Sequence, residues 1–187
     1  MESRQSYEQL LEKYGAHKYI LYSELISCAE WWQKRSLIVN RDGMRCRFCN
    51  KVETDSVFID SKLIHFYEEF EEADFYYGEY FLQTRVKSVM KKAKKPVYLH
   101  VHHTYYILSN KPWDYPDDAL ITLCSECHAD FHQNNRVPIW FDDTRKVMAN
   151  LTPCPRCQGA GHFPEYSHVQ GGRCFDCNGA MYVELMR

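Results

Sequence analysis

Cysteine spacing constrains this chain of 187 residues more than any other feature of its sequence. Eight of the nine cysteines form four pairs with two residues between the partners, namely Cys46/Cys49, Cys124/Cys127, Cys154/Cys157 and Cys174/Cys177. The two-residue gap forms a tight turn that aims two thiolates at one tetrahedral ion, whereas a secreted disulfide framework would rarely repeat it four times. The sequence therefore predicts two structural Zn²⁺ ions, each bound by four cysteines.

The same cysteine usage indicates the cellular environment. Reduced thiols and zinc-bound thiolates are typical of a reducing compartment, so we expect a cytoplasmic protein. The chain does not open with a charged segment followed by an apolar one, and it contains no uninterrupted apolar run long enough to span a bilayer. We therefore expect no membrane partner.

Charge is nearly balanced over the whole chain, with a formal net value of -2, so there is no global signature of nucleic-acid binding. Locally, an acidic run at residues 68–74 precedes a run of six cations, which comprises Arg85, Lys87, Lys91, Lys92, Lys94 and Lys95. These cations form either the solvated face of a helix or contacts to a nucleic-acid backbone. In the second interpretation, the residues expected to contact nucleic acid are Lys91, Lys92, Lys94 and Lys95.

Residue patterns predict an α+β fold. The expected elements, in chain order, are a helix over residues 6–14, a helix over 23–39 with Ser23 as its N-cap, a helical insertion over 62–95, strands over 97–103 and 120–123, and a helix over 125–134 with Ser125 as its N-cap. The insertion is expected to end at Pro96. Its aromatic residues are interpreted as core packing rather than as a base-stacking platform; they are Phe75, Tyr76, Tyr77, Tyr80 and Phe81.

Four histidines lie in the expected strand–strand–helix unit. On a strand, His102 and His103 point to opposite faces, so one can bind a metal while the other faces a different group. On the helix, His128 and His132 are four residues apart and share a face, a spacing by which two imidazoles can bind one ion. A structural metal is fully coordinated, as expected for the four cysteines, whereas a catalytic metal keeps one coordination position open, as expected for the histidines.

The segments RDGMRCRFC, LHVHH and LITLCSECHADFH together resemble the HNH endonucleases, a family of ββα-metal nucleases. The resemblance covers roughly residues 30–134 and implies a single-metal hydrolase of phosphodiester bonds. It implies that His103 is the general base, and that His102, His128 and His132 bind one catalytic divalent ion, with Mg²⁺, Mn²⁺, Ni²⁺ and Zn²⁺ all left open. Double-stranded DNA is the substrate that the resemblance favours, and RNA is not excluded.

The chain departs from the family pattern at one point. The family's middle asparagine falls near Asp118 or Ala119, and neither residue is an asparagine. Asp118 is expected to accept the same backbone hydrogen bonds and is therefore included with His103 among the expected catalytic residues. A non-catalytic zinc scaffold with a degenerate site, which binds nucleic acid or a partner protein, is the alternative, and a toxin or defence effector is a third interpretation.

Beyond residue 136 the sequence changes character. Within residues 137–187, CPRCQGAG and CFDCNGAM resemble the CxxCxGxG repeats of the DnaJ-type zinc domain, although Met181 replaces the last glycine of the second copy. Two copies imply half of such a domain, with one ion. We therefore expect residues 1–136 to form the HNH-like domain, with an insertion at about 55–96, followed by a connector with a strand in VPIWFDD and a zinc hairpin that could dock a protein partner.

Overall fold

A computed structural model describes residues 4–15, 20–108, 110–161, 163, 166 and 168–186. It contains both helices and small sheets, so the predicted α+β class is confirmed. The division at residue 136 stays a prediction. No helix within the described residues is long and apolar enough to cross a membrane.

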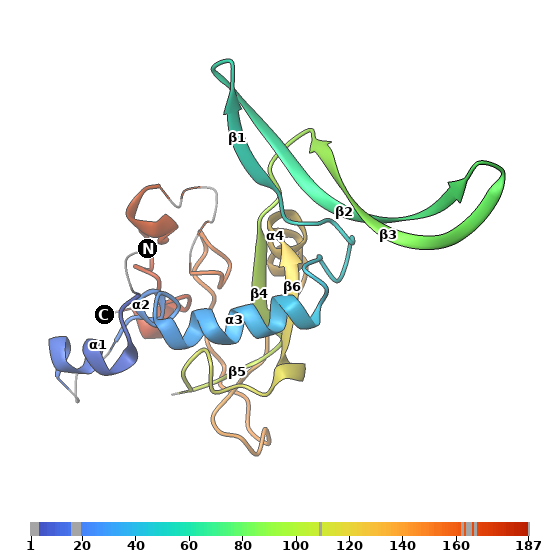
Figure 1. The fold of residues 1–187 in the computed structure, drawn as a ribbon. Coiled ribbons are helices and arrows are strands. Elements are labelled where there is room, and N and C mark those ends of the chain that lie inside the picture. The colour runs from blue at the N-terminus through green and yellow to red at the C-terminus, as the bar shows by residue number, and fades with distance from the viewer. Residues whose placement is uncertain are drawn as a thin grey trace.

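The centre of the fold is a two-stranded antiparallel sheet with a helix on each face (Figure 1). Strands β4 (Leu99–His103) and β6 (Leu120–Cys124) pair so that Leu99 lies opposite Cys124 and His103 lies opposite Leu120. Helix α4 (Ser125–Asn134) follows β6 directly, and α3 (Ala29–Arg41) packs on the opposite face. The predicted strand–strand–helix unit is confirmed, although the N-cap of α4 is Cys124 rather than Ser125.

The first predicted helix is confirmed and the second is corrected. Helix α1 (Tyr7–Tyr14) is capped by Ser6, whose hydroxyl accepts a hydrogen bond from the Gln9 backbone at 3.2 Å. The long helix expected from Ser23 is interrupted, because α2 (Tyr22–Leu25) ends after one turn and α3 starts only after Cys28. Cys28 has an extended backbone and is only 1% exposed. This break allows side chains from both helices to contact the same buried strand.

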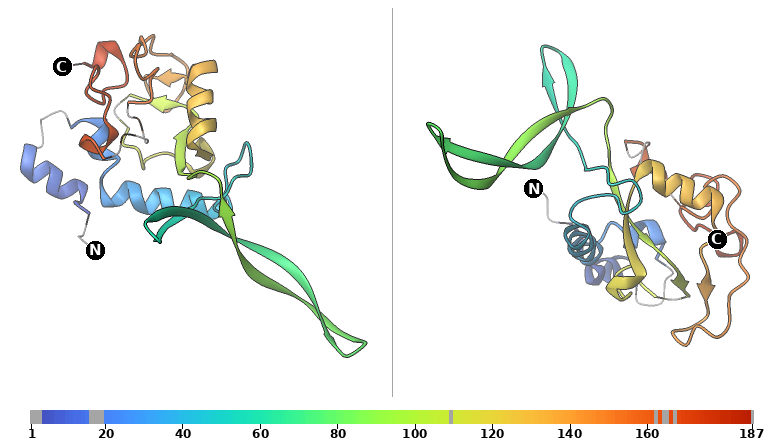
Figure 2. Two further views of the ribbon diagram at one scale, coloured as in Figure 1. Left: turned by 90° about the horizontal axis from the view of Figure 1, so that it is seen from above. Right: turned by 90° about the vertical axis from the view of Figure 1, so that its right-hand side faces the viewer.

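The helical insertion expected at residues 62–95 is wrong. Strands β1 (Asp55–Ile59), β2 (Lys62–Tyr77) and β3 (Tyr80–Ala93) form an antiparallel sheet, here called the arm (residues 55–93), that projects from the core (Figures 1 and 2). Glu71 of β2 lies directly opposite Lys87 of β3, Lys91 of β3 forms ion pairs with Glu69 and Glu71, and Gly78 forms the turn with a φ of 60°. The acidic and basic runs therefore meet across the two strands of a hairpin instead of forming faces of a helix.

The aromatic residues of the arm are exposed, so their interpretation as core is also wrong. Near the turn, Tyr77 and Tyr80 are each 77% exposed, and Tyr76 is 59% exposed. Phe75 is also exposed, whereas the side chain of Phe81 lies outside the described residues. A strand places alternate side chains on opposite faces, and the arm projects too far from the core for either face to be covered along its length.

Shortening the arm is expected to leave the rest of the chain folded. The variant lacks residues 72–86 and joins Glu71 to Lys87, which are cross-strand partners, through Asn-Gly. Because the deleted side chains are largely exposed, we expect the Tm to change by less than about 4 °C and helical circular dichroism to be retained. Thermal unfolding with parallel zinc analysis measures this, and loss of bound zinc would contradict it.

The C-terminal region packs against the N-terminal helices and the core. Strand β7 (Ile139–Trp140) pairs in parallel with β5 (Tyr106–Ile107), which confirms a short strand in VPIWFDD. The 3-10 helix η1 (Asp117–Ala119) leads into β6, and η3 (Gln170–Gly172) and η4 (Val183–Leu185) lie near the C-terminus. A side chain at Gly179 would meet Ser23 Oγ at 3.0 Å, so this contact with α2 requires glycine.

Candidate metal centre

The structure brings the first two cysteine pairs together as one group, here called the first cysteine cluster: Cys46, Cys49, Cys124 and Cys127. Their Sγ atoms all lie within 4.8 Å of one another, and none forms a disulfide. Cys49 Sγ lies 3.6 Å from Cys124 Sγ, close to the separation of about 3.8 Å that two ligands of a tetrahedral zinc–sulfur site require. The predicted grouping is confirmed, and it connects the end of α3 to the junction of β6 and α4.

Backbone groups prepare the first cysteine cluster for a cation. Burial raises the pKa of the Cys46 thiol, but hydrogen bonds from the Cys49, Cys124 and Phe48 backbones outweigh it and lower this pKa to about 7. Asn50, immediately after the pair, has a φ of 62°, which closes the turn around sulfur. Backbone N–H groups that point at thiolates favour the deprotonated form that binds metal.

The remaining pairs form the second cysteine cluster, with Cys154, Cys157, Cys174 and Cys177 also within 4.8 Å. Its two halves exchange equivalent hydrogen bonds: Cys154 N–H donates to the Met181 carbonyl at 2.9 Å, and Cys174 N–H donates to the Gly161 carbonyl at 3.0 Å. Gly161 and Met181 both have positive φ, so the sequence departure at Met181 does not change the backbone. A side chain at Gly161 would meet Met181 Cγ at 2.8 Å, which explains why only one copy can lose its glycine.

Three histidines form the histidine cluster, which consists of His102, His128 and His132. Their ring nitrogens lie within 4.8 Å of one another on the α4 side of the sheet. Among the described residues, the buried Nε2 of His102 has no hydrogen-bond partner. Burial, and then the nearby His132 and His103, lower the pKa of His102 to about 3. A neutral, buried imidazole nitrogen that faces two other imidazoles fits a divalent transition metal.

His103 lies on the opposite face of β4, as predicted from strand geometry, and is 2% exposed. Its Nε2 lies 2.9 Å from the Pro112 carbonyl oxygen, which can only accept, so Nε2 carries the proton and Nδ1 has the lone pair. The Tyr22 hydroxyl donates to Nδ1 at 3.4 Å, and the Trp31 ring stacks on the imidazole at 5.2 Å between centroids. Burial lowers the pKa of His103 to about 4.

Five histidines line one small cavity of about 80 Å³: the three of the histidine cluster, His103 and His100. Its wall also includes Tyr22 from α2, Arg35 from α3 and Ala160 from the segment between the cysteines of the second cluster. The cavity therefore joins residues from the sheet, both flanking helices and the C-terminal region. Sequence reasoning did not assign Tyr22 or Ala160 to this site, because neither lies near the histidines in sequence.

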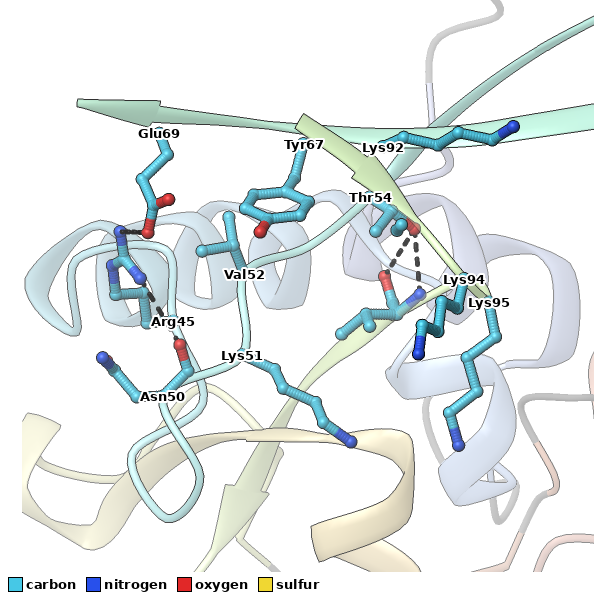
Figure 3. Close-up of a pocket in the computed structure, with 12 residues that line it drawn as sticks. Arg45, Asn50, Lys51, Val52, Thr54, Tyr67, Glu69, Lys92, Lys94 and Lys95 are labelled. Carbon is cyan, nitrogen blue, oxygen red and sulfur yellow. Dashed lines mark hydrogen bonds and ion pairs between the residues drawn. The ribbon is translucent and has the colours of Figure 1, made fainter. Parts of the chain in front are cut away.

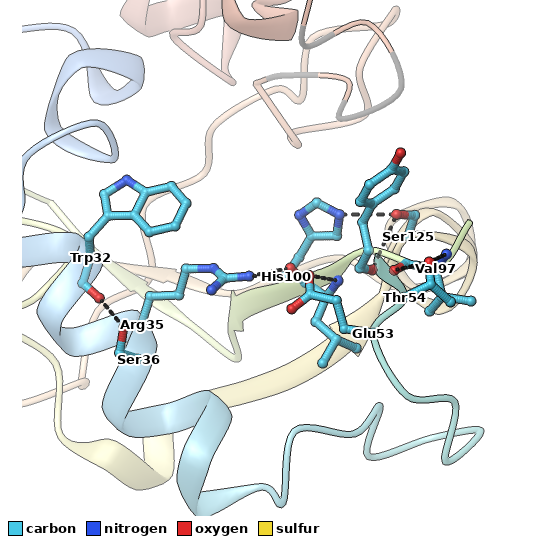
Figure 4. Close-up of polar contacts among 10 residues, drawn as sticks. Trp32, Arg35, Ser36, Glu53, Thr54, Val97, His100 and Ser125 are labelled. Carbon is cyan, nitrogen blue, oxygen red and sulfur yellow. Dashed lines mark hydrogen bonds and ion pairs between the residues drawn. The ribbon is translucent and has the colours of Figure 1, made fainter. Parts of the chain in front are cut away.

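Arg35 and His100 extend the cavity wall along β4 (Figure 4). The guanidinium of Arg35 donates to the Leu99 carbonyl at 2.8 Å and lies 3.8 Å from a Glu53 carboxylate oxygen. His100 Nε2 lies 3.0 Å from Ser125 Oγ. Arg35 follows Trp31 by one helical turn, so the sequence could have placed both side chains on the face of α3 that covers the sheet.

Asp118 and the predicted nucleic-acid-contacting lysines all lie outside the histidine-lined cavity, and the role predicted for the lysines stays a prediction. Asp118 is exposed on η1, and the carbonyl oxygens that hold this region belong instead to Pro112, which accepts from His103, and to Ala119, which accepts from the Thr104 backbone at 2.8 Å. Ion pairs with Glu69 and Glu71 raise the pKa of Lys91. Lys92, Lys94 and Lys95 line a separate pocket. Of the unassigned histidines, His17 and His162 lie outside the described residues.

The burial of His103 predicts an acid-sensitive stability. In the unfolded chain its pKa takes the ordinary value of 6.5, whereas in the folded chain it is about 4. This contribution is therefore fully present above pH 6.5 and is lost as the pH falls toward 4, because the unfolded state takes up a proton that the folded state does not. Between pH 7 and 5 the loss from His103 should be about 2 kcal/mol.

Urea unfolding of the wild type and of His103→Gln at both pH values measures this difference. Glutamine cannot become charged, while acid effects on the cysteines and on the other histidines are common to both proteins. The fall in unfolding free energy should be about 2 kcal/mol smaller in the variant. Equal falls in the two proteins would show that His103 is accessible to protons in the folded chain.

Comparison of the chain with protein-family models, with curated proteins and with solved structures found no match. The resemblance to HNH endonucleases therefore rests on the sequence motifs alone. The grouping of eight cysteines and three histidines as candidate metal ligands is a property of the structure, independent of any relative.

Proposed function

We propose that this chain is a metal-dependent endonuclease of the HNH type that hydrolyses phosphodiester bonds, with DNA favoured over RNA as its substrate. One observation carries the proposal: the histidine cluster and the oriented imidazole of His103 line the same cavity. The first cysteine cluster fixes β6 and α4 beside them. A ligand-binding histidine group next to a closed sulfur site supports a catalytic rather than a purely structural role.

The donor set fits a divalent cation. His102, His128 and His132 would bind it, and three neutral imidazoles suit Mn²⁺, Ni²⁺ or Zn²⁺ better than Mg²⁺, which prefers oxygen ligands. When bound, such an ion acts as a Lewis acid that stabilises negative charge on a phosphate group. The two cysteine clusters are compatible with structural metal ions, and we propose that both bind Zn²⁺.

His103 acts as the general base in this proposal. The Pro112 carbonyl holds the proton on Nε2 and turns Nδ1 toward the cavity side occupied by the Tyr22 hydroxyl. Because its pKa is held well below neutrality, the imidazole is uncharged at pH 7 and available to accept a proton from an attacking water molecule. That water must share or take the position of the Tyr22 hydroxyl, so a shift of α2 would accompany catalysis.

Arg35 is the cation in the cavity wall nearest to this chemistry. Its guanidinium is fixed by the Leu99 carbonyl and lies against the ring of Trp32, with 5.0 Å from Cζ to the ring centroid. A guanidinium in a fixed orientation presents paired donors to phosphate oxygens. We propose that Arg35 orients the phosphodiester, while His103 accepts the proton of the attacking water.

Metal-dependent cleavage of plasmid DNA tests the proposed function. Protein purified with both cysteine clusters loaded is treated with a mild chelator and then supplied separately with Mn²⁺, Mg²⁺, Ni²⁺ or Zn²⁺. Nicking or linearisation should return with at least one transition metal and be absent without it. His128→Ala should lose this response while the zinc content per chain stays the same. Absence of cleavage with every metal would overturn the proposal.

A non-catalytic scaffold is the second candidate, and the small cavity favours it. A volume of about 80 Å³ and the 2% exposure of His103 leave no room for a phosphodiester without movement. In this case the chain would bind nucleic acid or a partner protein, the latter through the region of the second cysteine cluster. Binding without cleavage in the plasmid assay would support the scaffold. Either function fits a reducing, cytoplasmic environment, which remains part of the proposal.

A further inference from the structure

A second and larger pocket lies where the first cysteine pair meets the base of the arm (Figure 3). Its volume is about 360 Å³, and it is here called the basic pocket. The loop that follows Cys46 forms one wall, β2 contributes Tyr67, and the end of β3 contributes Lys92. None of the five cavity histidines lines it, so the two pockets are distinct.

Five cations line the basic pocket: Arg45, Lys51, Lys92, Lys94 and Lys95. Glu69 is the single acidic residue among its lining residues. That carboxylate is already engaged, because Arg45 lies 4.0 Å away and Lys91 lies 2.7 Å away. The pocket therefore has a strong excess of positive charge, in a chain whose net charge is negative.

Part of this charge is held in place by α4. Glu126, in the first turn of α4, forms ion pairs with both Lys51 and Lys95, and hydrogen bonds from these lysines lower its pKa to about 2. Within the described part of the chain, Lys92 and Lys94 form no ion pair. Two ion-paired lysines and two lysines without an ion pair among the lining residues favour a ligand that carries a concentrated negative charge, such as phosphate.

The inner wall of the basic pocket has a different character. Figure 3 shows the Tyr67 ring pointing from β2 into the pocket above Val52, and Val97 adds a further apolar side chain. Thr54 is occupied in holding the wall together, since it accepts a hydrogen bond from the Val97 backbone at 2.9 Å. An aromatic ring beside a cationic rim is the combination that single-stranded nucleic-acid sites use for base and backbone.

We propose that the basic pocket binds one nucleotide unit of a nucleic-acid strand, with its phosphate among Lys92, Lys94 and Lys95 and its base against Tyr67. The volume suits a ligand of this size. The inference rests on the proposed function only in taking nucleic acid as the substrate. Because Glu126, two residues before His128, pairs with Lys51 and Lys95, a bound unit would lie close to the start of the helix that carries His128 and His132.

Competition binding on the full-length chain tests the ligand. The probe is a short fluorescein-labelled single-stranded oligodeoxynucleotide, followed by fluorescence anisotropy without added divalent metal. Competitors are a deoxynucleoside monophosphate, the same deoxynucleoside and inorganic phosphate. The monophosphate should compete at concentrations about tenfold or more below either part alone, because stacking and charge then act together. Inorganic phosphate that competes as well as the monophosphate would overturn the nucleotide assignment.

Matched variants test the location. Lys94→Glu should weaken oligonucleotide binding about tenfold, whereas Lys87→Glu, an equal charge change on the arm outside the pocket, should have a clearly smaller effect. Tyr67→Leu should remove the advantage of the monophosphate over phosphate, and Tyr67→Phe should retain it. Equal effects of the two lysine variants would overturn the pocket as the site. Plasmid cleavage is measured separately, so binding at the pocket in a chain that does not cleave would refute the nuclease alone.

Discussion

His103→Gln is expected to lower the rate of phosphodiester cleavage by about 10²–10⁴-fold, the range typical for loss of a general base. The glutamine amide can still donate to the Pro112 carbonyl, so the loop contact at 2.9 Å is retained. What is lost is the Nδ1 lone pair that faces the Tyr22 hydroxyl. Initial rates of plasmid nicking, at saturating metal, measure the effect.

Two controls separate chemistry from folding in this experiment. His65→Gln makes the same chemical change on the arm, where His65 Nδ1 lies 2.7 Å from Ser56 Oγ, and it should keep the wild-type rate. Zinc content and oligonucleotide affinity should be unchanged in His103→Gln. Wild-type cleavage by this variant would remove His103 from the mechanism, even if the histidine cluster proved to bind metal.

Cys46→Ser should have the largest effect on stability. Removing one thiolate from the first cysteine cluster is expected to release its ion and to destabilise the chain by more than about 4 kcal/mol. The reason is topological, because the cluster joins sulfurs such as those of Cys49 and Cys124, which are 75 residues apart in sequence. Without the ion, the junction of β6 and α4 is no longer held to the end of α3.

Cys28→Ser is the matched control, because Cys28 is the one cysteine outside both clusters. It is 1% exposed, and its Sγ lies 3.4 Å from the Glu24 carbonyl, a contact that a serine hydroxyl can also make. After treatment with a mild chelator, which removes any ion from the histidine cluster, elemental analysis should give two zinc ions per chain for this control and one for Cys46→Ser, with urea unfolding in parallel. Two ions in Cys46→Ser would show that the four sulfurs do not form one site.

The candidate ligands could be predicted because each depends on local geometry. The two-residue gap fixes the orientation of each cysteine pair, the helical turn brings His128 to His132, and strand alternation separates His102 from His103. These rules operate within a few residues and do not require knowledge of the fold. The structure groups the same eleven side chains that these rules selected, namely the two cysteine clusters and the histidine cluster.

What the sequence did not predict depends on contacts between distant segments. The Pro112 carbonyl reaches His103 across nine residues, and Tyr22 reaches it across 81, so neither partner has a local signal. Asp118 was selected by register alone; its side chain is exposed, and the hydrogen bonds that hold this region are made by the Pro112 and Ala119 carbonyls. The arm was misread because its order of acidic and basic residues suits a helix as well as a hairpin, and only strand pairing distinguishes them.

The opposite charges of the two long strands of the arm have a consequence for solubility. Within the described residues, β1 covers only the first part of β2, so the rest of that edge of β2 and the outer edge of β3 are unpaired. Unpaired strand edges commonly promote aggregation. Two molecules related by a two-fold axis would have to pair β2 with β2 or β3 with β3. Around Phe70 this would set Glu69 against Glu71, and around Val89 it would set Lys87 against Lys91. Like charges therefore disfavour two-fold pairing of either edge with the same edge of a second copy.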